Sequence, residues 1–364
     1  SWRSSILCAA NPFVSNVHRT GSMKRKDPDI LKLALLLLIA SGCKITRPDT
    51  PLNLAAKKAY YFWQVDAQLP APEELHSAGG ELLYVRLFDL SSSGGEIRPV
   101  AVRGAVQAKY AIIPVVYLTL PALENLRDLD LLAQRTLRLV RQLVPIDQIT
   151  ELQLDADWTR STRKRYFRFL RALRAEITKA GLSWRLSATI RLHQLRDQSM
   201  GLPPVDRGML MIYNTGRLTD FSEENSILKR ETALPYLRYA SRYPVPLDLA
   251  LPDFAWAVAF VHGSFHALVS GVEENNQRSH LLPVGPNRYL LKESMGFGGI
   301  LLPERTHLRF ERADPGTRIQ VLHDIKDLPP LADRRLAIFD YQKDRTLKNR
   351  EELQRLFRIA GNGL

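Results

Sequence analysis

The stretch ELQLDADWTR, Glu151–Arg160, alternates apolar and polar residues and carries two aspartates two positions apart. Side chains on a strand point alternately to opposite faces, which separates an apolar row from a polar row. The two rows are Leu152, Leu154, Ala156 and Trp158, and Gln153, Asp155, Asp157 and Thr159. Ionised carboxylates are costly to bury unless they are paired or used, so the polar row should end at a solvated opening or a site.

Seven further apolar or β-rich runs lie on either side of this strand, and helical patterns separate several of them. The eight predicted strands are 59–66, 82–90, 112–120, 151–157, 184–193, 208–214, 245–252 and 335–341, and the clearest predicted helices are 126–143, 161–180 and 346–360. Strands that alternate with helices imply parallel pairing, and eight such units favour a closed (β/α)8 TIM barrel of the α/β class.

One connection is much longer than the others. More than 80 residues separate the seventh and eighth predicted strands, and they include the strand-rich stretch SMGFGGILLPERTHLRFERAD. A plain loop of that length is uncommon in a compact domain. We therefore expect a barrel over residues 57–364 with an inserted subdomain at about 265–325.

Polar and aromatic residues recur where the predicted strands end. Active sites of TIM barrels lie at the carboxyl ends of the strands, so these residues form the predicted site. Besides Asp155 and Asp157 they are Trp63, Gln64, Asp66, Arg191, His193, Tyr213, Asn214, Trp256 and Asp340. A purely structural alternative is that the two aspartates pair with Arg191 inside the barrel.

LQLDADWT resembles the fourth-strand signature of the family 18 glycoside hydrolases, the chitinase-like barrels, which reads D-G-x-D-x-D-x-E. Asp155 and Asp157 fall on its last two aspartates. MLMIYN is similar to the sixth strand of that family, where Tyr213 would face the substrate, and LDLALPDFAW is similar to the seventh. The resemblance implies a polysaccharide as substrate or ligand and a catalytic role for the two aspartates.

Thr159 stands where that family has its catalytic glutamate. A threonine hydroxyl is too weak an acid to protonate a glycosidic oxygen near neutral pH, so the family mechanism cannot run unchanged. Two functions follow. In the first, Asp157 works with another carboxyl group, from Asp66, Asp89, Asp248, Glu223 or Glu224, as a glycosidase. In the second, the barrel only binds carbohydrate, with aromatic residues including Phe254 stacking on sugar rings.

The amino-terminal region resembles a bacterial lipoprotein signal peptide. From Met23 the chain has a basic start, an apolar run over 33–40 and then Ser-Gly-Cys, which ends at Cys43. We expect an upstream extension over 1–22, a signal peptide over 23–42, lipidation of Cys43 and a linker over 43–56. That predicts a lipid-anchored envelope protein, and Lys44 favours the outer membrane.

The formal net charge is +13, and much of the positive charge lies on predicted helices, as in TRSTRKRYFRFLRALRAEITKAG. No nucleic-acid-binding motif accompanies it, so we expect a solvated helix face and no nucleic-acid partner; attraction to anionic lipid or polysaccharide stays open. No ligand spacing supports a metal site. His262 and His266 have the spacing of a helical metal pair but lack the accompanying glutamate, and no phosphate-binding motif occurs. We expect no cofactor.

Overall fold

The computed structural model describes residues 57–270, 278–325, 328 and 333–361. The predicted signal peptide, the lipidation site Cys43 and the linker over 43–56 lie outside the described residues. Within the described part of the chain, no helix is both long and apolar enough to cross a membrane.

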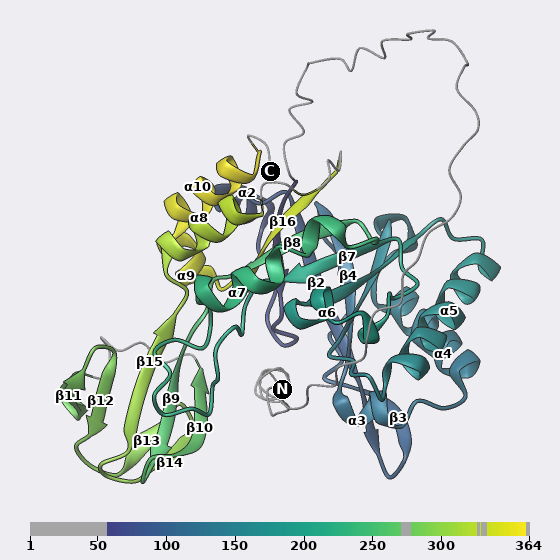
Figure 1. The fold of residues 1–364 in the computed structure, drawn as a ribbon. Coiled ribbons are helices and arrows are strands. Elements are labelled where there is room, and N and C mark those ends of the chain that lie inside the picture. Colours follow the sequence, from purple (N-terminus) through teal and green to yellow (C-terminus); the bar gives the residue numbers. More distant parts are fainter. Residues whose placement is uncertain (1–56, 271–277, 326–327, 329–332, 362–364) are drawn as a thin grey trace, which may run out of the picture.

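Eight parallel strands close into a barrel, which confirms the predicted (β/α)8 fold (Figure 1). Their order is β1-β16-β8-β7-β6-β5-β4-β2, and pairing of β2 with β1 closes the ring. Each observed strand overlaps one of the eight predicted runs. The barrel strands are β1 (Lys57–Phe62), β2 (Leu82–Ser93), β4 (Ala111–Leu118), β5 (Glu151–Ala156), β6 (Arg185–Arg191), β7 (Arg207–Met211), β8 (Leu247–Pro252) and β16 (Arg335–Phe339).

Helices follow most of these strands, and the second strand is the exception. After β2 the chain forms an antiparallel hairpin with β3 (Glu96–Val100) and then a loop to β4. The predicted carboxyl-terminal helix is divided in two near Asn349, whose side chain donates to Asp253. The helices are α2 (Pro72–Ser77), α3 (Leu120–Glu124), α4 (Leu129–Leu143), α5 (Arg163–Lys179), α6 (Leu192–Arg196), α7 (Arg230–Leu237), α8 (Pro315–Asp324), α9 (Lys343–Lys348) and α10 (Arg350–Gly361), with short 3-10 turns η1 (Ile146–Gln148), η2 (Gln198–Met200) and η3 (Ala240–Arg242).

An antiparallel subdomain is inserted between β8 and β16, as the long connection predicts. Its five-stranded sheet has the order β10-β9-β15-β12-β11, and a separate hairpin joins β13 to β14. It projects from one side of the barrel (Figure 1). Its strands are β9 (Ala255–Val261), β10 (Ser264–Ser270), β11 (Leu281–Gly285), β12 (Arg288–Leu291), β13 (Met295–Phe297), β14 (Ile300–Leu302) and β15 (His307–Arg312).

The polar row of β5 points into the barrel, and its apolar row faces the helices. Gln153 accepts a hydrogen bond from the Tyr61 hydroxyl at 2.6 Å across the interior. On the outer side, Trp158 stacks on Tyr166 of α5 with ring centroids 5.3 Å apart. The last residues of the polar row, Asp155 and Asp157, therefore lie near the carboxyl ends of the strands. We call this end of the barrel the mouth.

Candidate functional site

Arg191 of β6 joins the two aspartates of β5 at the barrel mouth. Its Nε donates to Asp157 Oδ1, and its Nη2 donates to Asp155 Oδ1 at 3.0 Å. Thr189, two residues earlier on β6, donates from Oγ1 to the same Asp155 oxygen at 2.6 Å. The Asp155 side chain is only 4% exposed, whereas those of Asp157 and Arg191 are each 14% exposed. The cluster therefore meets solvent on its Asp157 side.

Burial shapes the protonation of these groups. It raises the pKa of Asp155, with the Asp157 charge adding to the effect and Arg191 opposing it. Burial alone would lower the pKa of Arg191, but the two carboxylates outweigh it and raise that pKa well above its usual range. Burial also lowers the pKa of His193, at the start of α6, although Asp157 opposes the shift. The arrangement is a neutral imidazole beside an arginine held between two acids.

Tyr213 lies next to this cluster and belongs to an aromatic group that fills the upper barrel. Burial raises the pKa of its hydroxyl, which interacts with Arg191. Its ring centroid lies 5.3 Å from that of Phe339 and 5.6 Å from that of Phe254. Trp63 packs on the other side of Phe339 at 5.3 Å and is 2% exposed. Tyr213 is thus the most accessible ring of the group, since Phe254 is also only 2% exposed.

Arg86 and Asp89 of β2 form a second buried ion pair at this end of the barrel. Arg86 Nε donates to Asp89 Oδ1 at 2.7 Å, and its guanidinium lies 5.1 Å from the centre of the Trp63 ring. A shift in strand register between Arg86 and Phe88 brings the two charged residues together. Sequence reasoning considered Asp89 but missed Arg86; the signal was a lone arginine inside the apolar run LLYVRLFDL.

Several buried polar atoms have no hydrogen-bond partner among the described residues, and three of them follow strands β1, β5 and β7. They are Trp63 Nε1 after β1, Asp157 Oδ2 after β5 and Asn214 Oδ1 after β7. Such atoms are uncommon in native proteins, because leaving them unpaired costs about 1–3 kcal/mol each. One donor and two acceptors at the mouth could therefore be satisfied by the hydroxyl groups of a bound molecule.

Several predicted site residues lie away from this cluster. Asp66 is exposed on the loop after β1, and the backbone carbonyl of Gln64 accepts from Arg103. Asp340 is fully buried, and its carboxylate accepts hydrogen bonds from Arg345 and Gln342 on the helical side of β16. Trp256 belongs to β9, where its Nε1 donates to Glu311 at 2.8 Å beneath the inserted sheet.

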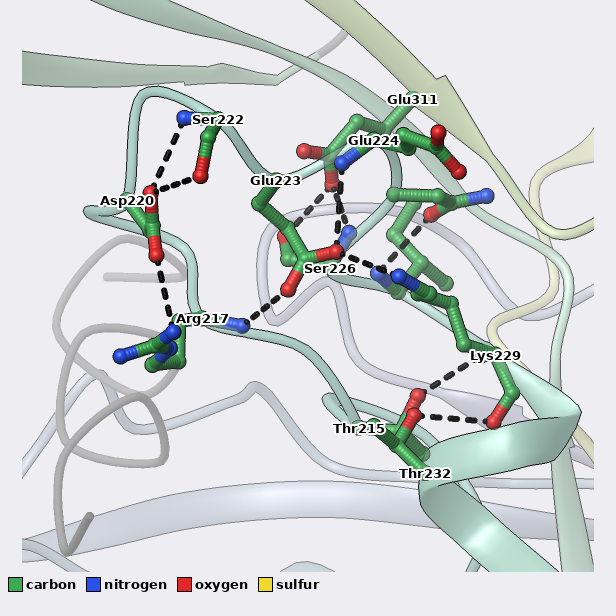
Figure 2. A network of polar contacts seen from close by, with 12 residues as sticks. Thr215, Arg217, Asp220, Ser222, Glu223, Glu224, Ser226, Lys229, Thr232 and Glu311 are labelled. Carbon is green, nitrogen blue, oxygen red and sulfur yellow. Dashed lines mark hydrogen bonds and ion pairs between the residues drawn. The ribbon is translucent and has the colours of Figure 1, made fainter.

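Three of the carboxyl groups predicted as partners for Asp157 lie elsewhere, and two of them have other partners. Asp248 lies at the opposite end of the barrel, the base, where Arg207 donates to it at 2.7 Å. Glu223 belongs to the loop after β7, and it accepts from Lys229 Nζ at 3.0 Å and from the Arg217 backbone at 2.9 Å (Figure 2). Glu224 is exposed on the same loop.

Thr159 lies on the turn between β5 and α5. Its Oγ1 lies 2.8 Å from Ser161 Oγ, and its backbone N–H donates to Thr162 Oγ1 at 2.9 Å. The residue is exposed and helps to order the turn into the helix. Within the described residues, no group of three or more His, Cys, Asp or Glu side chains is placed to hold a metal ion.

These observations define a (β/α)8 barrel with an inserted β subdomain and a charged cluster at its mouth. The solved structures that are similar to it include the following two. One is a family 18 chitinase from Cycas revoluta in complex with allosamidin, with 14% identity, coverage of 84% of this chain and 99% of that one, and a TM-score of 0.52. The other is the spore cortex-lytic enzyme SleL of Bacillus megaterium QM B1551, with 11% identity, coverage of 83% and 75%, and a TM-score of 0.51.

No family model and no curated protein matches the sequence. At such low identity the structural similarity establishes the fold alone, a (β/α)8 barrel like those of these two structures.

Proposed function

We propose that this chain binds a glycan at the barrel mouth without hydrolysing it. The observation that carries the proposal is the set of unpaired polar atoms Trp63 Nε1, Asp157 Oδ2 and Asn214 Oδ1. Sugar hydroxyl groups both donate and accept hydrogen bonds, so one ligand could satisfy the indole donor and the two oxygen acceptors. The Tyr213 ring beside them offers an apolar surface for a sugar face.

The pairing of the two aspartates argues against hydrolysis. Glycoside hydrolysis needs one carboxyl group that is protonated and reaches the leaving oxygen. Here Asp155 and Asp157 both accept hydrogen bonds from Arg191, so neither carboxyl group is free to reach a leaving oxygen. The position of the family's catalytic acid is Thr159, whose hydroxyl is used within its own turn. Asp157 is therefore assigned as a hydrogen-bond acceptor for sugar.

A glycosidase is the second candidate, and the raised pKa of Asp155 is the observation that favours it. Burial stabilises the protonated form of that carboxyl group, which is the form a general acid requires. Asp155 would need contact with the ligand for this role, and its side chain is 4% exposed. Hydrolysis would thus require Arg191 and Asp157 to move.

Location at the bacterial envelope is part of the proposal. Its support is the basic and apolar segment before Cys43, which resembles a lipoprotein signal. A lipid on Cys43 would tether the barrel to a membrane while the mouth meets its glycan. Mass spectrometry of the amino-terminal peptide tests this, and a free thiol on Cys43 in the mature protein would contradict it.

The binding proposal is tested on a glycan array, followed by calorimetry and reducing-end assays on the glycans that bind. We expect wild-type binding without release of reducing ends. Asp157→Asn should weaken binding about tenfold, because it removes a charged acceptor. Asp147→Asn, at an exposed position in η1, is the matched control and should bind like wild type. Release of reducing ends that Asp155→Asn abolishes would reject the binding function in favour of the hydrolase.

A further inference from the structure

Helices α4 and α5 lie side by side on the flank of the barrel opposite the inserted subdomain (Figure 1). Their outward faces carry a row of exposed basic side chains on each helix, which together we name the basic strip. It consists of Arg135, Arg138 and Arg141 on α4 and Lys164, Arg168 and Arg171 on α5. Among the described residues, none of the six side chains forms an ion pair or a hydrogen bond with another group.

The two helices are strongly unbalanced in charge. Together they hold ten Lys and Arg residues and two acids, Asp130 and Glu176. Glu176 already pairs with Lys179 at 3.4 Å. Like charges three or four residues apart on a helix destabilise it, and Arg138 with Arg141 and Arg168 with Arg171 have that spacing. Because this spacing of positive charges opposes helix stability, it indicates an anionic partner that would offset the repulsion.

A surface depression runs between the carboxyl-terminal halves of these helices, with a volume of about 550 Å³. Arg138 and Arg141 line it from α4, and Lys179 lines it from α5. Leu137 and Ala180 also line it, together with the acid Glu176. Arg138 and Arg141 belong to the basic strip, whereas Lys179 pairs with Glu176. A row of exposed cations beside such a depression fits an elongated molecule that carries repeated negative charges.

We propose that the basic strip binds a linear anionic polysaccharide, at a site separate from the mouth. A membrane-binding face would present aromatic or large apolar residues, but the aromatic side chains of α5 are buried in the core. The exposed large apolar residues on this face are Leu131 of α4 and Ile146, which lines the depression. Single-stranded nucleic acid is bound through stacking on exposed aromatic rings, which the two helices also lack. Carboxylate, sulfate or phosphate groups on a sugar chain match the exposed guanidinium groups.

The test measures binding of the full chain to polygalacturonate by affinity electrophoresis, with dextran as the neutral polymer. Wild type should be retarded by polygalacturonate and not by dextran, and the retardation should fall with added salt. The triple variant Arg135→Gln/Arg138→Gln/Arg141→Gln should weaken binding about tenfold or more, because three charged contacts are lost. The variant with Lys at the same three positions should retain most of the binding.

The matched control is Arg350→Gln/Arg355→Gln/Arg358→Gln on α10, which removes three exposed charges elsewhere. Equal weakening by this control would reject the strip in favour of net charge. Tighter binding of RNA or of phosphatidylglycerol vesicles, with the same dependence on Arg135, Arg138 and Arg141, would reject the polysaccharide. Loss of polygalacturonate binding in Asp157→Asn would assign the polymer to the mouth instead, whereas failure of the mouth to bind any glycan leaves the strip's result unaffected.

Discussion

Asp248 shows how single residues inside this barrel depend on charged partners. Arg207 donates to its Oδ1 at 2.7 Å, and the backbone N–H of Arg335 donates to the same oxygen at 2.8 Å. Arg335 also donates to Glu151 at 2.8 Å. A buried ion network thus fills the base of the barrel, where layers of branched apolar side chains are more usual.

Burial raises the pKa of Asp248 to about 6, although Arg207 and Arg335 oppose the shift. A carboxyl group whose pKa is higher in the folded state binds its proton more tightly there than in the unfolded chain. Its contribution to stability is therefore largest near pH 4 and is lost as the pH rises to about 6.

We expect the stability of wild type relative to Asp248→Asn to fall by about 3 kcal/mol between pH 3 and pH 7, because the variant has no proton to lose. Urea unfolding of both proteins at a series of pH values measures this difference. Parallel pH profiles for the two proteins would show that Asp248 keeps an ordinary pKa.

The residues of the candidate site were predictable wherever strand alternation determines whether a side chain points into the barrel or toward the helices. Asp155 and Asp157 follow an alternating row, and the row does point inward. Asp340 was grouped with them because it ends an apolar strand. Phe339 faces the interior, whereas Asp340 accepts hydrogen bonds from Gln342 and Arg345, and the sequence of a fully buried strand does not reveal which side chains point inward.

At the scale of elements, the loop over 214–229 connects the mouth to the inserted sheet. Glu311 of β15 accepts a hydrogen bond from the Ser226 backbone at 2.9 Å (Figure 2). It also accepts one from Trp256 at 2.8 Å. Arg309 of the same strand donates to the Leu218 backbone at 3.0 Å. Since Asn214 begins this loop, the inserted sheet helps to position one side of the candidate site.

Gly216 allows the two ends of the loop to approach closely. A Cβ atom there would lie 2.7 Å from Glu223 Oε2 and 2.8 Å from Ser226 Cα, both closer than real contacts allow. Gly216→Ala should destabilise the protein by about 1–3 kcal/mol, as overpacking does, and should speed hydrogen exchange over 214–229.

Gly104 provides the control, because a Cβ atom there would meet nothing within 4 Å. Gly104→Ala should leave stability unchanged or raise it by about 0.4–1 kcal/mol. If both variants unfold at the same urea concentration, close packing at Gly216 does not hold the loop.

Elements with strong periodicity were predictable, and irregular ones were not. All eight barrel strands and helices α4 and α5 follow their patterns. The hairpin with β3 was missed, because SSSGGEIRPV has no continuous apolar run and its side chains stay exposed or half-buried. The partners of interior arginines such as Arg86 and Arg335 were also beyond reach, because these ion pairs join distant strands or depend on a local register shift.

At the scale of the whole molecule, the inserted sheet is divided between two cores. Trp256, Val258 and Phe260 of β9 pack into the main barrel core, whereas Ala257 and Ala259 on the opposite face belong to a second, smaller core. The second core is formed mostly by residues from β10 to β15. Because alternate side chains of β9 point to opposite faces of the inserted sheet, this one strand joins the two hydrophobic cores.

This coupling predicts that barrel and subdomain unfold as one cooperative unit. Loss of the inserted sheet would expose Trp256 and Phe260 and leave Ser226 without Glu311, which penalises a state with only the barrel folded. Hydrogen exchange in rising urea should therefore show β5 and β12 losing protection at the same midpoint. If β12 loses its protection from hydrogen exchange at a lower urea concentration than β5, the smaller core folds independently of the barrel. The inserted sheet would then support the mouth only while it is folded and packed against the barrel.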